Sequence, residues 1–203
     1  MTPMANEHHI DYTGSKLGMW LFLLTELILF GGMFLLYSVY RFKYSQDFHM
    51  AASELDTVIG ALNTVILLTS SLTMALSIAT IKKDSKKLSL ILQGLTIILA
   101  FGFLLNKYFE WRAKIHHGIY PGSPELLTQS KGHILFYSLY YVMTGLHGFH
   151  VVAGIVLLFI MLCLTAKENI HAKDFVKLEN SGLYWHLVDV IWIYLFPLFY
   201  LIT

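Results

Sequence analysis

The sequence predicts an all-α membrane protein, a bundle of five transmembrane helices, from its composition and from the length of its apolar runs. Of its 203 residues, 56% are hydrophobic and only 13% are charged, about half the charged share of an average soluble domain. So few charges cannot cover a water-facing surface. Five apolar runs of about 18 residues or more can each cross roughly 30 Å of hydrocarbon as a helix. A polytopic membrane protein follows.

The five predicted spans cover about residues 17–40, 57–81, 88–111, 134–166 and 182–202, within a single transmembrane domain of residues 1–203. Short polar segments join them. The fourth span is longer than a membrane requires, so we expect it to tilt or to project past the headgroups. Residues 112–133 contain Pro121-Gly122 and Pro124, and we expect them to form a loop outside the membrane.

The distribution of Lys and Arg predicts how the chain is oriented. Five spans place the two termini on opposite sides of the membrane, and cytoplasmic loops are the ones enriched in basic residues. We therefore expect the N-terminus in the cytoplasm and the C-terminus outside. The N-terminal side has eight basic residues (Lys16, Lys82, Lys83, Lys86, Lys87, Lys167, Lys173, Lys177) and the other side has five (Arg41, Lys43, Arg112, Lys114, Lys131).

Four ionisable residues inside the spans each require a partner, a neutral protonation state or a function. They are Glu26 in the first span, His147 and His150 in the fourth, and Asp189 in the fifth. At 1.5 Å per residue, Glu26 and the two histidines lie within about 4 Å of the middle of their spans, so they share one depth. We expect Glu26 to contact His147 or His150. Such a contact either only pairs helices or also handles protons, and both roles remain open.

Histidine spacing raises the question of a metal site. His147 and His150 stand three residues apart, as do His186 and Asp189, so each pair shares one helix face. This spacing alone is a weak indication, because no Glu-x-x-His pair accompanies it. Small residues around His147 also favour close helix packing over an open coordination site. We expect no metal ligands in this chain, and buried, hydrogen-bonded structural histidines instead.

Residues near the ends of the spans are expected to meet the lipid headgroups. Lys107, Glu110 and Arg112 cluster at the outer end of the third span, where long basic side chains reach lipid phosphates or a neighbouring carboxylate. We expect a lipid headgroup site there. Trp185 lies near the start of the fifth predicted span, where an indole ring is typical of the membrane interface, whereas Trp192 sits deep.

Five short strings occur along successive spans, each weak alone but specific in combination. They are Gly18-Met19-Trp20-Leu21-Phe22-Leu23 followed by Thr25-Glu26, Asn63-Thr64 with Ser70-Ser71, Tyr108-Phe109-Glu110-Trp111, Thr144-Gly145-Leu146-His147-Gly148-Phe149-His150-Val151, and Tyr184-Trp185-His186-Leu187-Val188-Asp189-Val190-Ile191-Trp192. Together they resemble cytochrome c oxidase subunit III, a subunit of the heme-copper respiratory oxidases. The last two strings are the most telling.

The resemblance covers residues 16–200 and implies an accessory subunit with no catalytic centre, heme or copper of its own. In the family this subunit packs on catalytic subunit I, in a complex with subunit II and others that holds the heme and copper. The resemblance implies that it supports proton uptake and stability of subunit I in aerobic electron transport. The carboxyl matching Glu26 is the carbodiimide-reactive one in the family, and phospholipid is associated with a helix cleft. The resemblance makes Glu26, His147, His150, Glu110 and Asp189 the positions of interest.

The number of spans departs from part of the family. Mitochondrial-type members have seven spans, and this chain begins at what resembles their third. The missing pair forms one wall of the lipid-filled cleft in those members. Five-span forms are typical of bacterial quinol oxidases and of some bacterial cytochrome c oxidases, so the resemblance implies a bacterial plasma membrane.

Two other classes of function compete with this assignment. The mid-membrane positions of Glu26, His147, His150 and Asp189 would suit an independent proton-coupled transporter. A small membrane metalloenzyme would need metal ligands from at least two spans. The formal net charge of +1 gives no long-range field that would attract nucleic acid, so no nucleic acid partner is expected.

Overall fold

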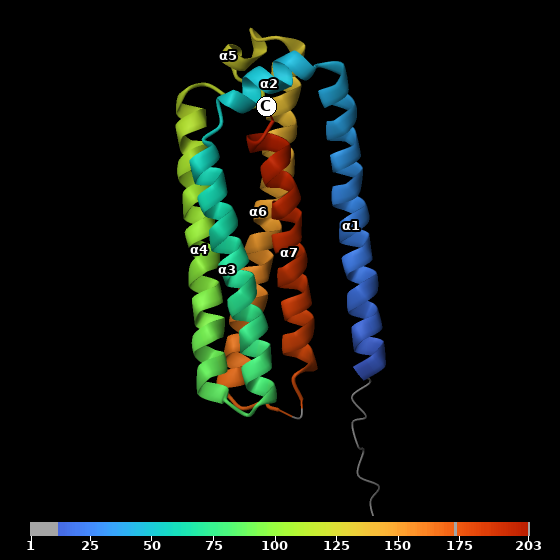
Figure 1. The fold of residues 1–203 in the computed structure, drawn as a ribbon, viewed down its shortest axis with the longest axis vertical. Coiled ribbons are helices and arrows are strands. Elements are labelled where there is room, and N and C mark those ends of the chain that lie inside the picture. Colours follow the sequence, from blue (N-terminus) through green and yellow to red (C-terminus); the bar gives the residue numbers. More distant parts are fainter. Residues whose placement is uncertain (1–11, 173, 203) are drawn as a thin grey trace, which may run out of the picture.

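The computed structural model describes residues 12–172 and 174–202. In these residues the chain forms seven helices, and its only β-type pairing is an isolated bridge between His171 and Asp174. Five helices are long and apolar enough to cross a membrane, and successive ones run in opposite directions (Figure 1). The helices are α1 (Tyr12–Lys43), α2 (Ser45–Ser53), α3 (Thr57–Lys82), α4 (Lys86–His116), α5 (Pro124–Leu127), α6 (Lys131–Ala166) and α7 (Val176–Tyr200).

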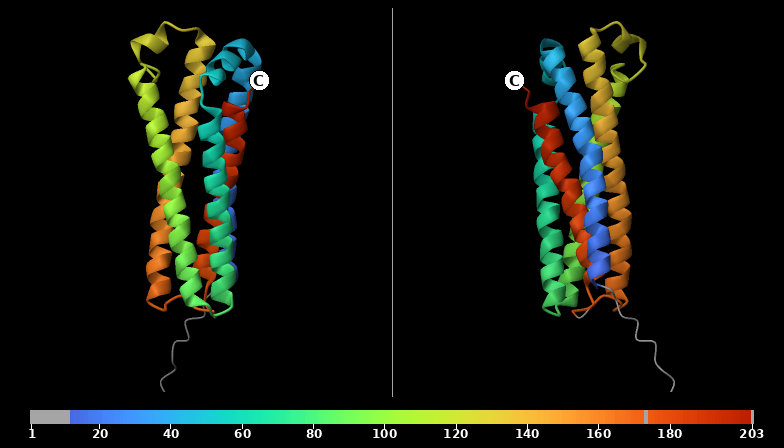
Figure 2. Two further views of the ribbon diagram at one scale, coloured as in Figure 1. Left: turned by 60° about the vertical axis from the view of Figure 1, so that its left-hand side comes forward. Right: turned by 90° about the vertical axis from the view of Figure 1, so that its right-hand side faces the viewer.

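The two short helices lie at the same end of the bundle as the C-terminus (Figures 1 and 2). We call this the α2 end, and we call the opposite end, which carries the turn between α3 and α4, the Lys86 end. The predicted fold class is confirmed. Every long helix extends past its predicted span by at least one residue at one end, because a helix continues through polar residues until a cap stops it. Asp56 caps α3 by accepting hydrogen bonds from the Val58 and Ile59 amides.

The connecting segments contain more helix than the sequence predicted. Residues 112–133 are not one loop, because α4 continues to His116 and α5 begins at Pro124. Ser123 caps α5 by accepting a hydrogen bond from the Leu126 amide, and proline fits the first turn of a helix because its missing N–H would have no partner there. Helix α2 also occupies a predicted connection. It buries Phe48 edge-on against the rings of Tyr37 and Phe136.

Most of the buried core residues lie on α3, α4, α6 and α7, and α1 runs along one side of these helices (Figure 1). Helices α3 and α4 form a close hairpin held by small hydroxyl residues. The hydroxyls of Thr73 and Thr96 lie 2.8 Å apart, and those of Ser77 and Ser89 lie 3.2 Å apart. Small side chains let membrane helices approach closely, and their hydroxyls find partners that lipid does not supply.

Trp185 is buried in the core and does not anchor at the membrane interface, so that prediction was wrong. Helix α7 begins at Val176, which places Trp185 well inside the helix. Its indole donates to the Ser70 hydroxyl in α3 at 3.0 Å, and its ring lies against Gly154 of α6. A Cβ atom on Gly154 would come within 2.8 Å of that ring. Glycine therefore sets the distance between α6 and α7 at this level.

Replacing Gly154 by Ala should destabilise the bundle. Trp185 is fully buried and cannot move aside, so overpacking should cost up to about 3 kcal/mol, against the roughly 1 kcal/mol that alanine gains in helix propensity. A lower thermal unfolding midpoint of the purified protein in detergent would show this. Gly102→Ala is the matched control, because a Cβ atom there meets nothing within 4 Å. An unchanged midpoint for Gly154→Ala would contradict the proposed close contact.

Candidate functional site

Glu26 of α1 and His150 of α6 form a polar contact inside the bundle. The Oε2 atom of Glu26 lies 2.9 Å from Nε2 of His150, and the two side chains are 14% and 10% exposed. Of the two histidines expected to meet Glu26, the partner is therefore His150. The Phe30 ring packs edge-on against the imidazole, and the Tyr184 hydroxyl donates to the His150 carbonyl oxygen at 3.0 Å. Helices α1, α6 and α7 thus meet at this histidine.

The contact made by the second ring nitrogen of His150 indicates which ring nitrogen carries a proton. Its Nδ1 atom is 2.8 Å from the carbonyl oxygen of Leu146, and a carbonyl only accepts hydrogen bonds, so Nδ1 carries a proton. Nε2 then either accepts from a neutral Glu26 carboxyl or belongs to an imidazolium that donates to the carboxylate. In both states one proton lies in the Glu26–His150 contact. The pair is net neutral in both, which avoids an uncompensated charge in hydrocarbon.

His147 lies one turn away in α6 and has a different environment. It is fully buried, and neither ring nitrogen has a hydrogen-bond partner among the described residues. Its ring packs between those of Phe103 in α4 and Trp192 in α7, with centroid distances of 5.6 and 5.4 Å. Of the two residues expected to be hydrogen-bonded structural histidines, His150 fits that expectation and His147 does not.

His186 and Asp189 lie where α7 meets α3. The Nδ1 atom of His186 is 2.6 Å from the Ser71 hydroxyl. The Asp189 carboxyl is also buried and lies near the same Ser71 hydroxyl. One turn further along α7, the Trp192 indole donates to Thr64 of α3 at 3.0 Å. These contacts tie α7 to α3. No group of three or more His, Cys, Asp or Glu side chains in the described ranges could hold a metal ion.

A second buried charged group surrounds Glu110 of α4. The Lys107 ammonium lies 3.0 Å from one carboxylate oxygen of Glu110, and the hydroxyls of Tyr140 in α6 and Tyr200 in α7 each donate to the other oxygen at 2.5 Å. Lys107 also donates to both hydroxyls, at 3.0 and 2.9 Å. All three donor positions of the ammonium are therefore used. We call these four residues the Glu110 cluster.

The Glu110 cluster corrects part of the expected headgroup site. Lys107 and Glu110 are only 8% and 7% exposed, so they face the bundle core and not the lipid phosphates, whereas Arg112 is exposed. Residues three apart share a helix face, which explains why Lys107 and Glu110 turn inward together. The sequence did not identify Tyr140 and Tyr200 as partners of this ion pair. Tyr140 lies seven residues before His147 and hence on the same face of α6, which is the only signal in the sequence.

Ion pairs at the Lys86 end are more exposed. Glu179 lies 2.8 Å from Lys16 and 3.0 Å from Lys82, and Lys86 lies 2.9 Å from Glu168. The hydrogen bond from Lys86, together with its charge, lowers the pKa of the Glu168 carboxyl below its usual value. Pairs exposed to this degree contribute little to stability. They tie α1 to α7, and α4 to the segment that follows α6.

Removing one charge of the Glu110 cluster should destabilise the protein more than removing both charges. Glu110→Leu leaves the Lys107 ammonium buried without a counter-charge, which costs about 3–5 kcal/mol in comparable pairs. Lys107→Met combined with Glu110→Leu removes both charges and should recover much of that loss. Thermal unfolding midpoints of the single and double variants would measure the coupling. Strictly additive effects would mean that the two charges do not depend on each other.

Comparison with known proteins assigns the family. The family model for cytochrome c oxidase subunit III matches residues 4–203. Cytochrome c oxidase subunit 3 of Bacillus sp. (strain PS3) is 32% identical over 98% of this chain and 92% of its own length. Probable quinol oxidase subunit 3 of Staphylococcus saprophyticus is 32% identical over 93% of this chain and 89% of its own. Heme-copper oxidase subunit I+III of Aeropyrum pernix is 30% identical over 91% of this chain and 22% of that longer protein. The chain therefore belongs to the cytochrome c oxidase subunit III family.

Proposed function

We infer that the chain is an accessory, non-redox subunit of a heme-copper terminal oxidase and that it packs on catalytic subunit I. The observation that carries this inference is the match to the subunit III family over residues 4–203. The Aeropyrum pernix relative, whose name joins subunits I and III in one protein, supports contact between the two. Heme and copper are assigned to partner subunits. The relatives give no support for the proton-coupled transporter considered from the sequence.

We further propose a bacterial plasma membrane, with the Lys86 end of the bundle in the cytoplasm and the α2 end outside. The turn between α3 and α4 supports this orientation, because it carries Lys82, Lys83, Lys86 and Lys87 within a few residues. Basic residues concentrate in cytoplasmic loops. The relatives named from Bacillus and Staphylococcus are consistent with a bacterial membrane.

The Glu26–His150 pair is the site to which we assign the subunit's support of proton uptake and stability in subunit I. Its geometry confines one proton between Oε2 and Nε2, and it ties α1 to the remaining bundle within the membrane. A net-neutral pair can change which group holds the proton without leaving a charge in hydrocarbon. We assign His147, His186 and Asp189 to helix pairing in the core.

Purification through a tag on this chain, in mild detergent, tests the proposed function. A larger polytopic protein that carries heme and copper should accompany it at a ratio of one to one, as measured by mass spectrometry and the heme spectrum. Removing this chain from the complex should leave the heme and copper in place, because they belong to the partner. A chain that emerges alone and intact would contradict membership of an oxidase complex.

A hydrophobic carbodiimide tests proton sharing by Glu26, because this reagent modifies protonated carboxyls inside membranes. It should label Glu26, and His150→Phe should increase the labelling rate, since the imidazole no longer competes for the proton. Peptide mass spectrometry would locate the adduct. Glu26→Gln should show no adduct at this position, and Asp189→Asn should label as the unaltered protein does. An unchanged rate in His150→Phe would show that the imidazole does not control the proton.

A further inference from the structure

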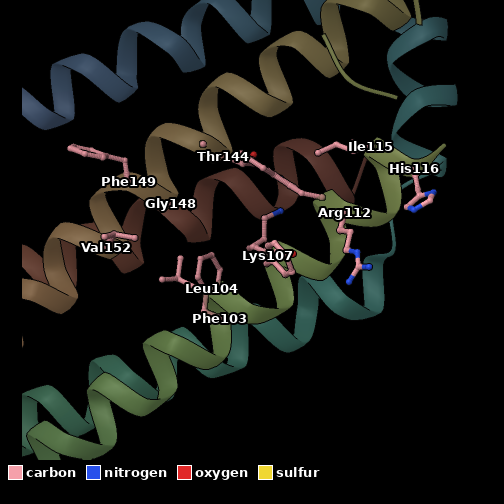
Figure 3. Close-up of a pocket in the computed structure, with 13 residues that line it drawn as sticks. Phe103, Leu104, Lys107, Arg112, Ile115, His116, Thr144, Gly148, Phe149 and Val152 are labelled. Carbon is pink, nitrogen blue, oxygen red and sulfur yellow. The ribbon is translucent and has the colours of Figure 1, made fainter. Parts of the chain in front are cut away.

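The Glu110 cluster joins two phenols to one buried carboxylate. The hydroxyls of Tyr140 and Tyr200 both donate to Oε1 of Glu110 at 2.5 Å, and both tyrosines are buried. The other carboxylate oxygen accepts from Lys107. In Figure 3 the Lys107 side chain points from α4 toward the interior of the bundle, and Arg112 points the other way. Each of the two phenol protons therefore faces a buried base.

Other phenols of the bundle have different acceptors. Three of them donate to main-chain carbonyl oxygens, namely Tyr37, Tyr141 and Tyr184. A carbonyl accepts a hydrogen bond but does not take up the proton. Tyr137 donates to the Glu54 carboxylate at 2.6 Å, but the Glu54 side chain is 44% exposed. Among these phenols, only Tyr140 and Tyr200 pair with a buried base.

A buried base beside a phenol favours loss of an electron from that phenol. A phenol that loses one electron also loses its proton, so it is oxidised readily only where a base can receive the proton, and Glu110 lies within hydrogen-bond reach of both hydroxyls. Lys107 donates to the two phenol oxygens at 3.0 and 2.9 Å. Each oxygen therefore keeps a hydrogen-bond donor after its own proton has moved. The same arrangement suits the phenol before and after oxidation.

The charge that such a step leaves in the core also has partners. Transfer of a proton to Glu110 neutralises the carboxylate and leaves the Lys107 ammonium without a counter-charge. Its Nζ atom lies 4.9, 5.3 and 5.5 Å from the ring centroids of Tyr140, Trp192 and Tyr200. Aromatic faces attract a desolvated ammonium. The three rings therefore offset part of the cost of the remaining charge.

Ring contacts connect the cluster to the outer surface of the bundle. The centroid distances are 6.4 Å between Tyr200 and Tyr140, 5.4 Å between Tyr140 and Tyr141, and 5.1 Å between Tyr141 and Trp111, all within the usual range for aromatic pairs. Trp111 lines an apolar groove between α4 and α6 (Figure 3). Its indole nitrogen has no hydrogen-bond partner among the described residues. Trp111 and Tyr141 thus lack a proton acceptor, and an electron vacancy on either ring is filled from the cluster.

We propose that Tyr140 and Tyr200 form a redox site for one-electron oxidants of the membrane, of the class of lipid peroxyl radicals, with Glu110 as proton acceptor. Trp111 gives one electron to the peroxyl radical, which takes one proton from the aqueous interface and becomes a hydroperoxide. An electron from Tyr140 or Tyr200 then restores Trp111 through the Tyr141 ring. The phenolic proton moves to Glu110, and a neutral tyrosyl radical remains.

The tyrosyl radical returns to a phenol when one electron reaches it through the same rings. A hydroquinone in the membrane is the class of donor, and it releases one of its own protons to water as it gives up the electron. Glu110 then returns its proton to the phenol oxygen at hydrogen-bond distance. This chemistry needs a membrane-spanning chain but no turnover of an oxidase.

Flash oxidation of the full chain, in the complex with which it leaves the membrane, tests the site. The probe is a tris(bipyridine)ruthenium complex with an alkyl tail, placed in nanodiscs and oxidised by a laser flash with persulfate. Tyr137→Phe is the parent protein for all variants, because the Tyr137 phenol has a carboxylate partner of its own. Electron paramagnetic resonance of samples frozen after the flash should show a tyrosyl radical in the parent. It should form more slowly in deuterated buffer, because a proton moves with the electron.

Variants locate the radical and its route. Adding Tyr140→Phe together with Tyr200→Phe should abolish the part of the signal that comes from this chain, and signals of partner subunits are the same in every variant and subtract out. Trp111→Phe should slow formation of the radical. Trp20→Phe is the matched control, because it removes an indole that is exposed on α1. Tyr184→Phe removes a buried phenol whose acceptor is a carbonyl. Neither control should change the signal.

Loss of the proton acceptor gives an independent test. Lys107→Met combined with Glu110→Leu keeps both phenols and leaves no unpaired charge in the core, and it should also abolish the signal. A signal that persists in this variant, or in the variant without both phenols, would overturn the proposal. So would a rate that is the same in ordinary and deuterated buffer. The flash replaces turnover of an oxidase, so failure of this site and failure of the proposed function can be told apart.

Discussion

Hydrocarbon cannot donate or accept hydrogen bonds, so most polar groups inside this bundle have a partner on another helix or in their own backbone, and His147 is an exception. Many positions of polar side chains follow from that constraint. The hydroxyl residues of α3 and α4 face each other across the hairpin. Lys107 has three oxygen partners from α4, α6 and α7. Each such contact fixes the rotation of a helix about its axis, which apolar side chains against lipid would leave free.

The same constraint applies to helix α1, which is the least buried of the five spans. Much of its surface faces outward, and leucines along it are exposed, as suits a helix in lipid. At the Lys86 end Asn180 donates to Ser15 and Lys16 pairs with Glu179. Glu26 meets His150 within the membrane, and the Tyr37 hydroxyl donates to the Leu198 carbonyl near the α2 end. A charged tie at mid-depth would be costly in hydrocarbon. A pair that shares one proton holds α1 in place without that cost.

The sequence was sufficient for the features that depend on one segment at a time. Five spans could be found because each is a long apolar run, and Glu26 could be matched to the histidines because depth follows from rise per residue. Features that depend on how each helix is rotated about its axis were missed. Trp185 was misplaced because the polar start of α7 resembles a loop, and the tyrosines of the Glu110 cluster come from α6 and α7. Their meeting depends on helix rotation, which composition does not encode.

Helix α4 shows how one buried charged pair sets the direction of a neighbouring charge. In the sequence Lys107, Glu110 and Arg112 form one charged cluster, but an α-helix turns 100° per residue, so Arg112 lies about 140° around the axis from Lys107. Both cannot face the same way. Because Lys107 and Glu110 are held inward by Tyr140 and Tyr200, the rotation of α4 is fixed and Arg112 must face outward. Burial of one charged pair thereby determines which cation remains exposed to the membrane surface.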